Sequence, residues 1–209
     1  MLIKICGITN LEDANVAIAA GANALGFNFY VRSPRYISPQ AARKIIDEIS
    51  AEVLTVGVFV NEESAAKVEE IASVAGVAAV QLHGDESPAF AAELKQRQVI
   101  KAFGVNDGFE PALAAAFPAD AVLLDAFDRR LHGGTGRTID WSLARATREL
   151  VPRLILAGGL SAENIAAAIE KVQPYGVDAC SALESSPGKK DHKHLRSFVE
   201  AARSSSVQT

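Results

Sequence analysis

The chain contains 209 residues, of which 49% are hydrophobic and 22% are charged, and its formal net charge is −4. This balance predicts a soluble globular protein with a sizeable core, and the negative charge argues against nucleic acid or an anionic membrane as its main partner. Two cysteines form no disulfide framework, and neither a signal peptide nor a membrane span is predicted, so we expect a cytoplasmic protein.

Short apolar runs typical of strands alternate along the chain with Ala-rich segments of helical spacing. The predicted strands lie at residues 2–6, 24–29, 54–60, 78–82, 99–103, 121–125, 154–157 and 176–180. The predicted helices lie near residues 11–20, 39–49, 62–75, 87–96, 109–116, 141–149, 162–172 and 192–202. Gly21 and Gly76 are placed as helix C-caps. Ser38-Pro39 and Ser161 are typical of helix starts.

Strands that are apolar at nearly every position predict a parallel sheet covered on both faces. Strict alternation of strand and helix leaves two α/β topologies, an open doubly wound sheet and a closed eight-stranded βα barrel. The count of eight units favours a single parallel βα (TIM) barrel with short loops, because about 250 residues is typical of that fold. We expect one barrel domain over residues 1–203 and a frayed polar tail over residues 204–209.

In a βα barrel the active site lies at the carboxyl ends of the strands. Polar residues or glycines occupy these ends here: Cys6, Asn28, Asn61, His83, Asp125, Gly158-Gly159 and Ser181. Alternation along the first strand places Lys4 on the same face as Cys6. Alternation along the eighth strand likewise places Asp178 with Cys180. Because these two strands are neighbours in a closed barrel, we expect Lys4 and Asp178 to pair inside it.

A thiol and a carboxyl at one rim are candidates for a general base and a general acid. Cys6 ends an apolar strand and precedes Gly7, which releases the backbone into a turn; an inert core thiol is the alternative. Asp125 directly follows four apolar residues, a position that is costly for an acid unless it is paired or functional. His83 is a secondary candidate that alternatively hydrogen-bonds a loop, and the pairing of Lys4 is interpreted as structural rather than catalytic.

Loops after the seventh and eighth strands are the usual phosphate site of this fold. Gly158 and Gly159 lie in the first of these loops, and Ser181 and Ala182 begin the second. A tight strand-to-helix turn is the alternative role for the glycine pair.

Two further loops carry candidate features. Arg35 stands between Pro34 and Tyr36 and is a candidate for binding a planar carboxylate, whereas Arg32 is compatible with solvated surface charge. The glycine-rich segment 132–137 is interpreted as a mobile cover over the pocket, with a flexible surface loop as the alternative.

Taken together, these motifs resemble the phosphoribosylanthranilate isomerase family in order and across nearly the whole chain. The matching segments are KICGIT (4–9), GF (26–27), SPRY (33–36), GVFVN (57–61), QLHG (81–84), LDA (124–126), GGTG (133–136), AGGL (157–160) and PGKKD (187–191). The resemblance implies a βα barrel that catalyses an Amadori rearrangement in tryptophan biosynthesis without metal or organic cofactor. The substrate would be N-(5-phosphoribosyl)anthranilate, and the product 1-(2-carboxyphenylamino)-1-deoxyribulose 5-phosphate.

The resemblance also implies roles for individual residues. Asp125 would be the general acid that protonates the ribose ring oxygen, and Cys6 the general base that removes the proton from ribose C2. Physical chemistry adds a condition: a thiol pKa is ordinarily about 8.5, so Cys6 needs a favourable field, for which Lys4 is the candidate source, offset by its pairing with Asp178. The implied substrate-binding residues are Arg35 for the anthranilate carboxylate, Gly158, Gly159, Ser181 and Ala182 for the phosphate, and His83.

Residues 178–184 read DACSALE, where the family commonly has DVSSGVE. Ala182 therefore replaces a glycine at the phosphate loop, so its φ must suit an alanine. Cys180 is placed beside Cys6, and oxidation of the two thiols to a disulfide is a further hypothesis.

Alternative functions are a sugar-phosphate epimerase or thiamine phosphate synthase type of barrel and a non-catalytic phosphometabolite-binding barrel. The epimerase would need His and Asp metal ligands at several strand ends, and the binding barrel would need neither Cys6 nor Asp125. A small phosphorylated molecule is the expected partner, and the protein is expected to be a monomer or a homodimer.

Overall fold

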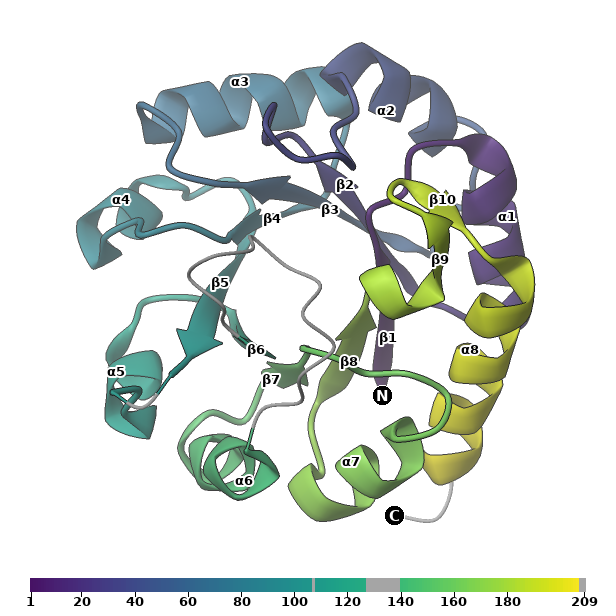
Figure 1. Cartoon of the computed structure of the whole chain (residues 1–209). Helices are drawn as coiled ribbons and strands as arrows, with labels where there is room; N and C mark the ends of the chain where they lie inside the picture. The colour runs from purple at the N-terminus through teal and green to yellow at the C-terminus, as the bar shows by residue number, and fades with distance from the viewer. Residues whose placement is uncertain (107, 127–139, 207–209) are drawn as a thin grey trace.

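The strands close into a barrel. The structure, a computed structural model, describes residues 1–106, 108–126 and 140–206, and its eight parallel strands follow one another around the barrel in chain order (Figure 1). They are β1 Leu2–Cys6, β2 Ala24–Asn28, β3 Leu54–Phe59, β4 Ala79–Leu82, β5 Gln98–Val105, β6 Ala121–Ala126, β7 Leu154–Leu156 and β8 Gly176–Ala179. Because β1 pairs with both β2 and β8, this sheet has no open edge. The barrel prediction is confirmed, and the open doubly wound sheet is excluded.

Helices form a ring outside the barrel (Figure 1). They are α1 Leu11–Ala20, α2 Pro39–Ile46, α3 Ala65–Ala75, α4 Pro88–Glu93, α5 Pro111–Ala116, α6 Trp141–Leu150, α7 Ile165–Val172 and α8 His192–Ser206. The predicted caps at Gly21 and Gly76 are confirmed, with φ of 109° and 75°. Ser38 caps α2 by accepting a hydrogen bond from the Ala41 N–H at 3.2 Å. Among the described residues, none of the helices combines the length and apolar character needed to cross a membrane.

The predicted helix start at Ser161 is wrong, because α7 begins only at Ile165. The side chain of Asn164 organises the segment between them: its Oδ1 accepts the Ser161 N–H at 2.9 Å, and its Nδ2 donates to the Gly159 carbonyl at 2.8 Å. These local side-chain hydrogen bonds hold a turn where the sequence pattern predicted a regular helix.

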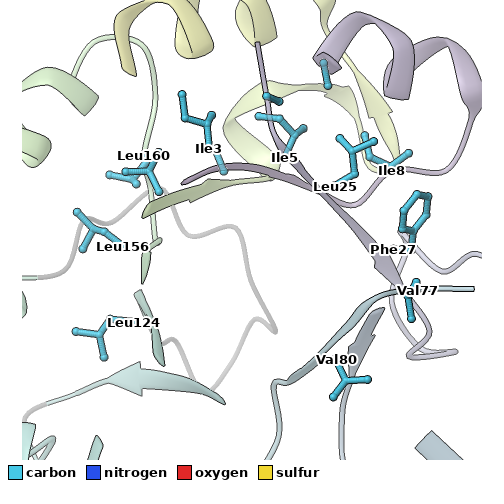
Figure 2. Packing of buried hydrophobic residues seen from close by; sticks show 14 of the residues in the cluster. Ile3, Ile5, Ile8, Leu25, Phe27, Val77, Val80, Leu124, Leu156 and Leu160 are labelled. Carbon is cyan, nitrogen blue, oxygen red and sulfur yellow. The ribbon is translucent and has the colours of Figure 1, made fainter. Parts of the chain in front are cut away.

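The core has two layers, one outside and one inside the barrel. Ile3 and Ile5 project from β1 toward the surrounding helices (Figure 2). The interior layer is made by Val56, Ala79, Ile100, Ala102, Ala121, Leu123, Ile155 and Ala157. Because side chains alternate along a strand, Lys4 and Cys6 lie on the interior face of β1.

The segment after β8 contains a small hairpin that the sequence pattern did not predict. It consists of the 3₁₀ turn η1 Ser181–Leu183, followed by the antiparallel strands β9 Glu184–Ser186 and β10 Lys189–Lys190. Asp13 on α1 anchors the hairpin, because its Oδ2 accepts the Lys190 N–H at 2.9 Å. The expectation of a frayed tail is not met at residues 204–206, which form the end of α8, and residues 207–209 lie outside the described residues.

A buried ion pair stabilises the ends of β3 and β4. Lys101 Nζ on β5 lies 2.8 Å from Glu86 Oε2 and 2.6 Å from the Gly84 carbonyl, and the two charged side chains are 4% and 2% exposed. Glu86 in turn accepts the N–H groups of Asn61 at 2.8 Å and Gly84 at 3.0 Å. The pair therefore fixes the loop that follows His83.

Replacing Lys101 with methionine would leave the Glu86 carboxylate buried without its cation. We expect Lys101→Met to lower the free energy of unfolding by about 3–5 kcal/mol, as measured by urea denaturation. The matched control is Lys67→Met, which breaks a solvent-exposed pair with Glu70 and is expected to leave the denaturation midpoint almost unchanged. Equal midpoints for the two variants would contradict this assignment.

Candidate active site

Cys6, His83 and Asp125 are brought to the same rim by β1, β4 and β6. Cys6 is 9% exposed, and the side chains of His83 and Asp125 are 34% and 28% exposed. His83 Nε2 lies 3.5 Å from Asp125 Oδ2, and its Nδ1 lies 2.8 Å from Nε2 of Gln81, the preceding interior residue of β4. The alternative in which His83 only hydrogen-bonds a loop is therefore not what the structure shows.

The imidazole of His83 is held next to a negative charge. Burial opposes protonation of His83, but the hydrogen bond and charge of Asp125 more than offset it, so the pKa of His83 is raised. A proton can therefore be held between an imidazole and a carboxylate that both face the barrel mouth.

Lys4 and Asp178 form the predicted pair inside the barrel, with Nζ and Oδ1 2.9 Å apart. Burial disfavours the charge of Lys4, but Asp178 and the Cys6 thiolate outweigh this effect and raise the pKa of Lys4. Burial, only partly offset by Lys4, raises the pKa of Asp178 to about 6. The predicted Lys4–Asp178 pair is therefore present, and it holds the ammonium of Lys4 on the interior face of β1 that also carries Cys6.

The surroundings of the Cys6 thiol lower its pKa and so favour the thiolate. The neighbouring Cys180 side chain lowers its pKa well below the ordinary value, and the positive charges of Lys4 and Lys190 act in the same direction although burial opposes them. Sequence analysis identified Lys4 but missed the contributions of Cys180 and Lys190. The pairing of β1 with β8, which makes Cys6 and Cys180 equivalent positions at the ends of adjacent strands, was the available signal for Cys180. Lys190 could not be foreseen because it lies on the hairpin strand β10, which the sequence pattern did not predict.

Arg35 is held by Glu184, a residue that sequence analysis missed. Arg35 Nε lies 2.8 Å from Glu184 Oε1, and Nη2 lies 2.7 Å from Oε2. Lys190 Nζ reaches the same carboxylate at 3.2 Å. This bidentate pairing raises the pKa of Arg35 and fixes its guanidinium near the rim, whereas Arg32 is exposed.

The two candidate phosphate loops follow the paired strands β7 and β8 and so leave the barrel at neighbouring positions. Gly158 and Gly159 have φ of 81° and 65°, and a Cβ on Gly158 would collide with the backbone nitrogen of Ala126. Ser181 and Ala182 open the 3₁₀ turn, where the first N–H groups have no partner within the turn. Ala182 does not have a positive φ, so an alanine is accommodated there without strain.

The structure leaves the predicted cover and the predicted disulfide untested, and it bears on the metal-dependent alternative. Segment 132–137, interpreted as a cover, lies outside the described residues. Within the described ranges, no three His, Cys, Asp or Glu side chains gather into a possible metal site, so the ligand set required by the epimerase alternative is not assembled there. Cys6 and Cys180 are both free thiols, and their oxidation to a disulfide stays a prediction.

A thiol with a lowered pKa and a carboxyl–imidazole pair at the carboxyl ends of barrel strands define a βα-barrel protein with a general acid–base site. Comparison with known proteins identifies its family. The model of the N-(5'phosphoribosyl)anthranilate (PRA) isomerase family matches residues 3–201. The chain therefore belongs to the PRA isomerase family.

Individual relatives match over nearly their whole length. The N-(5'-phosphoribosyl)anthranilate isomerase of Pelobacter propionicus is 49% identical over 201 residues, which cover 96% of this chain and 95% of the relative. The crystal structure of phosphoribosyl anthranilate isomerase from Thermotoga maritima has a TM-score of 0.91 at 43% identity, covering 98% of this chain and 100% of that one. A phosphoribosyl anthranilate isomerase in complex with reduced 1-(o-carboxyphenylamino)-1-deoxyribulose 5-phosphate has a TM-score of 0.87 at 42% identity, with the same coverage.

Proposed function

We propose that this protein converts N-(5-phosphoribosyl)anthranilate into 1-(2-carboxyphenylamino)-1-deoxyribulose 5-phosphate, an Amadori rearrangement in tryptophan biosynthesis. The observation that carries the proposal is the placement of Cys6 and Asp125 on the interior face of one rim, in a chain of the PRA isomerase family. A non-catalytic binding barrel has no use for a thiol of lowered pKa at that position.

The rearrangement needs one acid and one base. Asp125 donates a proton to the ribose ring oxygen, the bond from that oxygen to C1 breaks, and a protonated Schiff base forms between C1 and the anthranilate nitrogen. The Cys6 thiolate then takes the proton from C2, and the C–H electron pair forms the C1–C2 double bond of an enolamine. Tautomerisation places a carbonyl at C2 and a proton at C1, so no electron acceptor is required.

Substrate binding is assigned to the charged and N–H-rich parts of the rim. The Nη1–Nη2 edge of Arg35 would bind the anthranilate carboxylate while Glu184 holds the Nε–Nη2 edge. The N–H groups of Gly159, Ser181 and Ala182, with Gly158 allowing close approach, would bind the phosphate. His83, beside Asp125, would contact the ribose.

The decisive experiment supplies N-(5-phosphoribosyl)anthranilate, generated in situ, and follows the decay of its fluorescence. We expect decay that depends on enzyme concentration, together with complementation of a tryptophan auxotroph. Absence of enzyme-dependent decay from folded protein would contradict the proposal and favour the binding-barrel alternative.

We also propose that the protein is cytoplasmic and that it is a monomer or a homodimer. Sedimentation of the purified protein distinguishes these two assemblies.

Arg35→Ala is expected to raise KM for the substrate by about ten- to a hundredfold, because a charge-assisted bidentate contact is lost. The turnover number should change less, because Arg35 is assigned to the carboxylate and not to the reacting carbons. Arg32→Ala is the matched control, since Arg32 is exposed on the same loop, and its KM should equal that of the wild type. An unchanged KM in Arg35→Ala would remove Arg35 from this role.

A further inference from the structure

Gln81 carries a buried amide that takes no part in the reaction steps above. Its side chain is fully buried on the interior face of β4, and the strand register places it between the apolar residues Val58 of β3 and Ile100 of β5. Burying an amide next to apolar side chains is unfavourable unless the amide is hydrogen-bonded. Within the described ranges, its Oε1 has no hydrogen-bond partner, whereas its Nε2 lies 2.8 Å from Nδ1 of His83. The amide of Gln81 is therefore anchored to the imidazole at the barrel mouth.

The contact between Gln81 and His83 determines which ring nitrogen carries the proton. An amide nitrogen donates hydrogen bonds and does not accept them, so Nδ1 of His83 accepts and carries no proton. A neutral imidazole of this kind has its proton on Nε2. Nε2 is the atom that lies 3.5 Å from Asp125 Oδ2. The ring therefore presents an N–H group, and not a lone pair, to the carboxyl group of Asp125.

The same contact opposes protonation of the ring. An imidazolium carries a second proton on Nδ1, and this proton would face the N–H group of Gln81. The amide would have to turn around and place its NH2 group at the buried position where Oε1 has no partner among the described residues. Gln81 therefore acts against Asp125, whose hydrogen bond and charge favour protonation of His83.

The other charged groups that act on His83 lie on β1. The thiolate of Cys6 favours protonation of the ring, and the ammonium of Lys4 opposes it, as burial does. Asp125 selects the Nε2–H form only while it is ionised, because a protonated carboxyl group can donate as well as accept. Once Asp125 is protonated, the hydrogen bond from Gln81 to Nδ1 still selects that form.

We propose that Gln81 is a positioning residue that holds His83 as its Nε2–H tautomer, so that the imidazole cannot take the proton that Asp125 gives to the substrate. The inference rests on the proposed function, in which Asp125 is the general acid. Without Gln81, the neutral ring can carry its proton on Nδ1 and present the Nε2 lone pair to Asp125. The O–H bond of the carboxyl group then breaks as an N–H bond forms, and an imidazolium beside a carboxylate remains in place of the acid.

The test follows the two ring nitrogens of His83 by nitrogen nuclear magnetic resonance in the full-length protein as a function of pH. In the wild type, the neutral ring should show an unprotonated Nδ1 and a protonated Nε2. Gln81→Met keeps the length of the side chain but removes the donor, and it should raise the pH at which the ring gains its second proton by about one unit. Gln81→Glu, whose carboxylate accepts a proton from Nδ1, should raise it further. The matched control is Gln98→Met at the exposed start of β5, which should leave the His83 signals unchanged.

Turnover provides a second measurement. Gln81→Met should lower kcat by about tenfold, because the shared proton then lies on the ring and not on Asp125. KM should change little, since Gln81 is buried beneath the rim and does not reach the substrate. Gln98→Met should keep the kcat of the wild type. A fall in kcat with no change in the titration of His83 would indicate a merely structural role and overturn the proposal.

A wild-type spectrum in which the neutral ring carries its proton on Nδ1 would also overturn the proposal, and this measurement holds even if neither Gln81 variant folds. Equal His83 titrations in the wild type and in Gln81→Met would do the same. Because the resonance measurement needs no substrate, failure of the proposed isomerase activity would appear separately, as the Nε2–H tautomer in a wild-type protein without turnover.

Discussion

Cys6→Ala is expected to lower kcat by about a hundred- to ten-thousandfold, which is the usual contribution of a general base. The thiolate is the group assigned to remove the C2 proton, and the neighbouring Lys4, Lys190 and Cys180 all lower its pKa. KM should change little, because the carboxylate and phosphate contacts are elsewhere on the rim. The measurement is steady-state fluorescence decay of the substrate.

Cys6→Ser sharpens this prediction. A serine hydroxyl nearly matches the thiol in size but is not ionised near neutral pH, so we expect a loss as large as in Cys6→Ala. Circular dichroism should show that both variants keep the barrel, since the sulfur is at the rim and not in the helix-facing core. Near-normal turnover in either variant would remove Cys6 from the role of base.

Asp125→Asn is expected to lower kcat by a similar factor, about a hundred- to ten-thousandfold. The amide is close in shape to the carboxyl group but cannot transfer a proton to the ribose ring oxygen, so ring opening should become rate-limiting. The substrate decay assay measures the loss directly, and wild-type turnover in Asp125→Asn would disprove the assignment.

Asp120 offers a matched control for this substitution. It lies just before the start of β6, at the opposite end from Asp125, and its Oδ2 accepts the Val99 N–H at 2.7 Å. Asp120→Asn should therefore keep full turnover per folded molecule. The pKa of His83, followed by nuclear magnetic resonance, should fall in Asp125→Asn because the carboxylate that raises it is lost, and it should not move in Asp120→Asn.

The repetitive part of the fold was predictable because its signals are local. The apolar runs located every barrel strand to within a few residues, and the glycine caps at Gly21 and Gly76 ended their helices as expected. The start of α7 was mispredicted because the side chain of Asn164, rather than Ser161, organises the turn. The hairpin β9–β10 was missed because its short polar strands carry neither helical nor strand periodicity.

The residues of the candidate site were predictable from the sequence, whereas most contacts between them were not. Strand ends identified Cys6 and Asp125 as candidates, and barrel closure predicted the pair of Lys4 with Asp178 that the structure contains. The contact of Asp125 with His83 and the bidentate hold of Glu184 on Arg35 were not foreseen. These contacts join loops and strand ends that are far apart in sequence, and no local pattern records which of them meet.

The sequence by itself determined the barrel, its strand ends and the candidate residues Cys6 and Asp125, because periodicity and the position of polar residues are properties of short segments. Only the tertiary structure decided the electrostatic setting in which those groups act. The register of β1 and β8 pairs Ile5 with Ala179, the residues just before Cys6 and Cys180, and Lys190 reaches both Cys180 and Glu184 from a hairpin. The charges that shift the pKa of a buried thiol act through space. They therefore act on Cys6 only in the folded chain, where residues distant in sequence lie next to it.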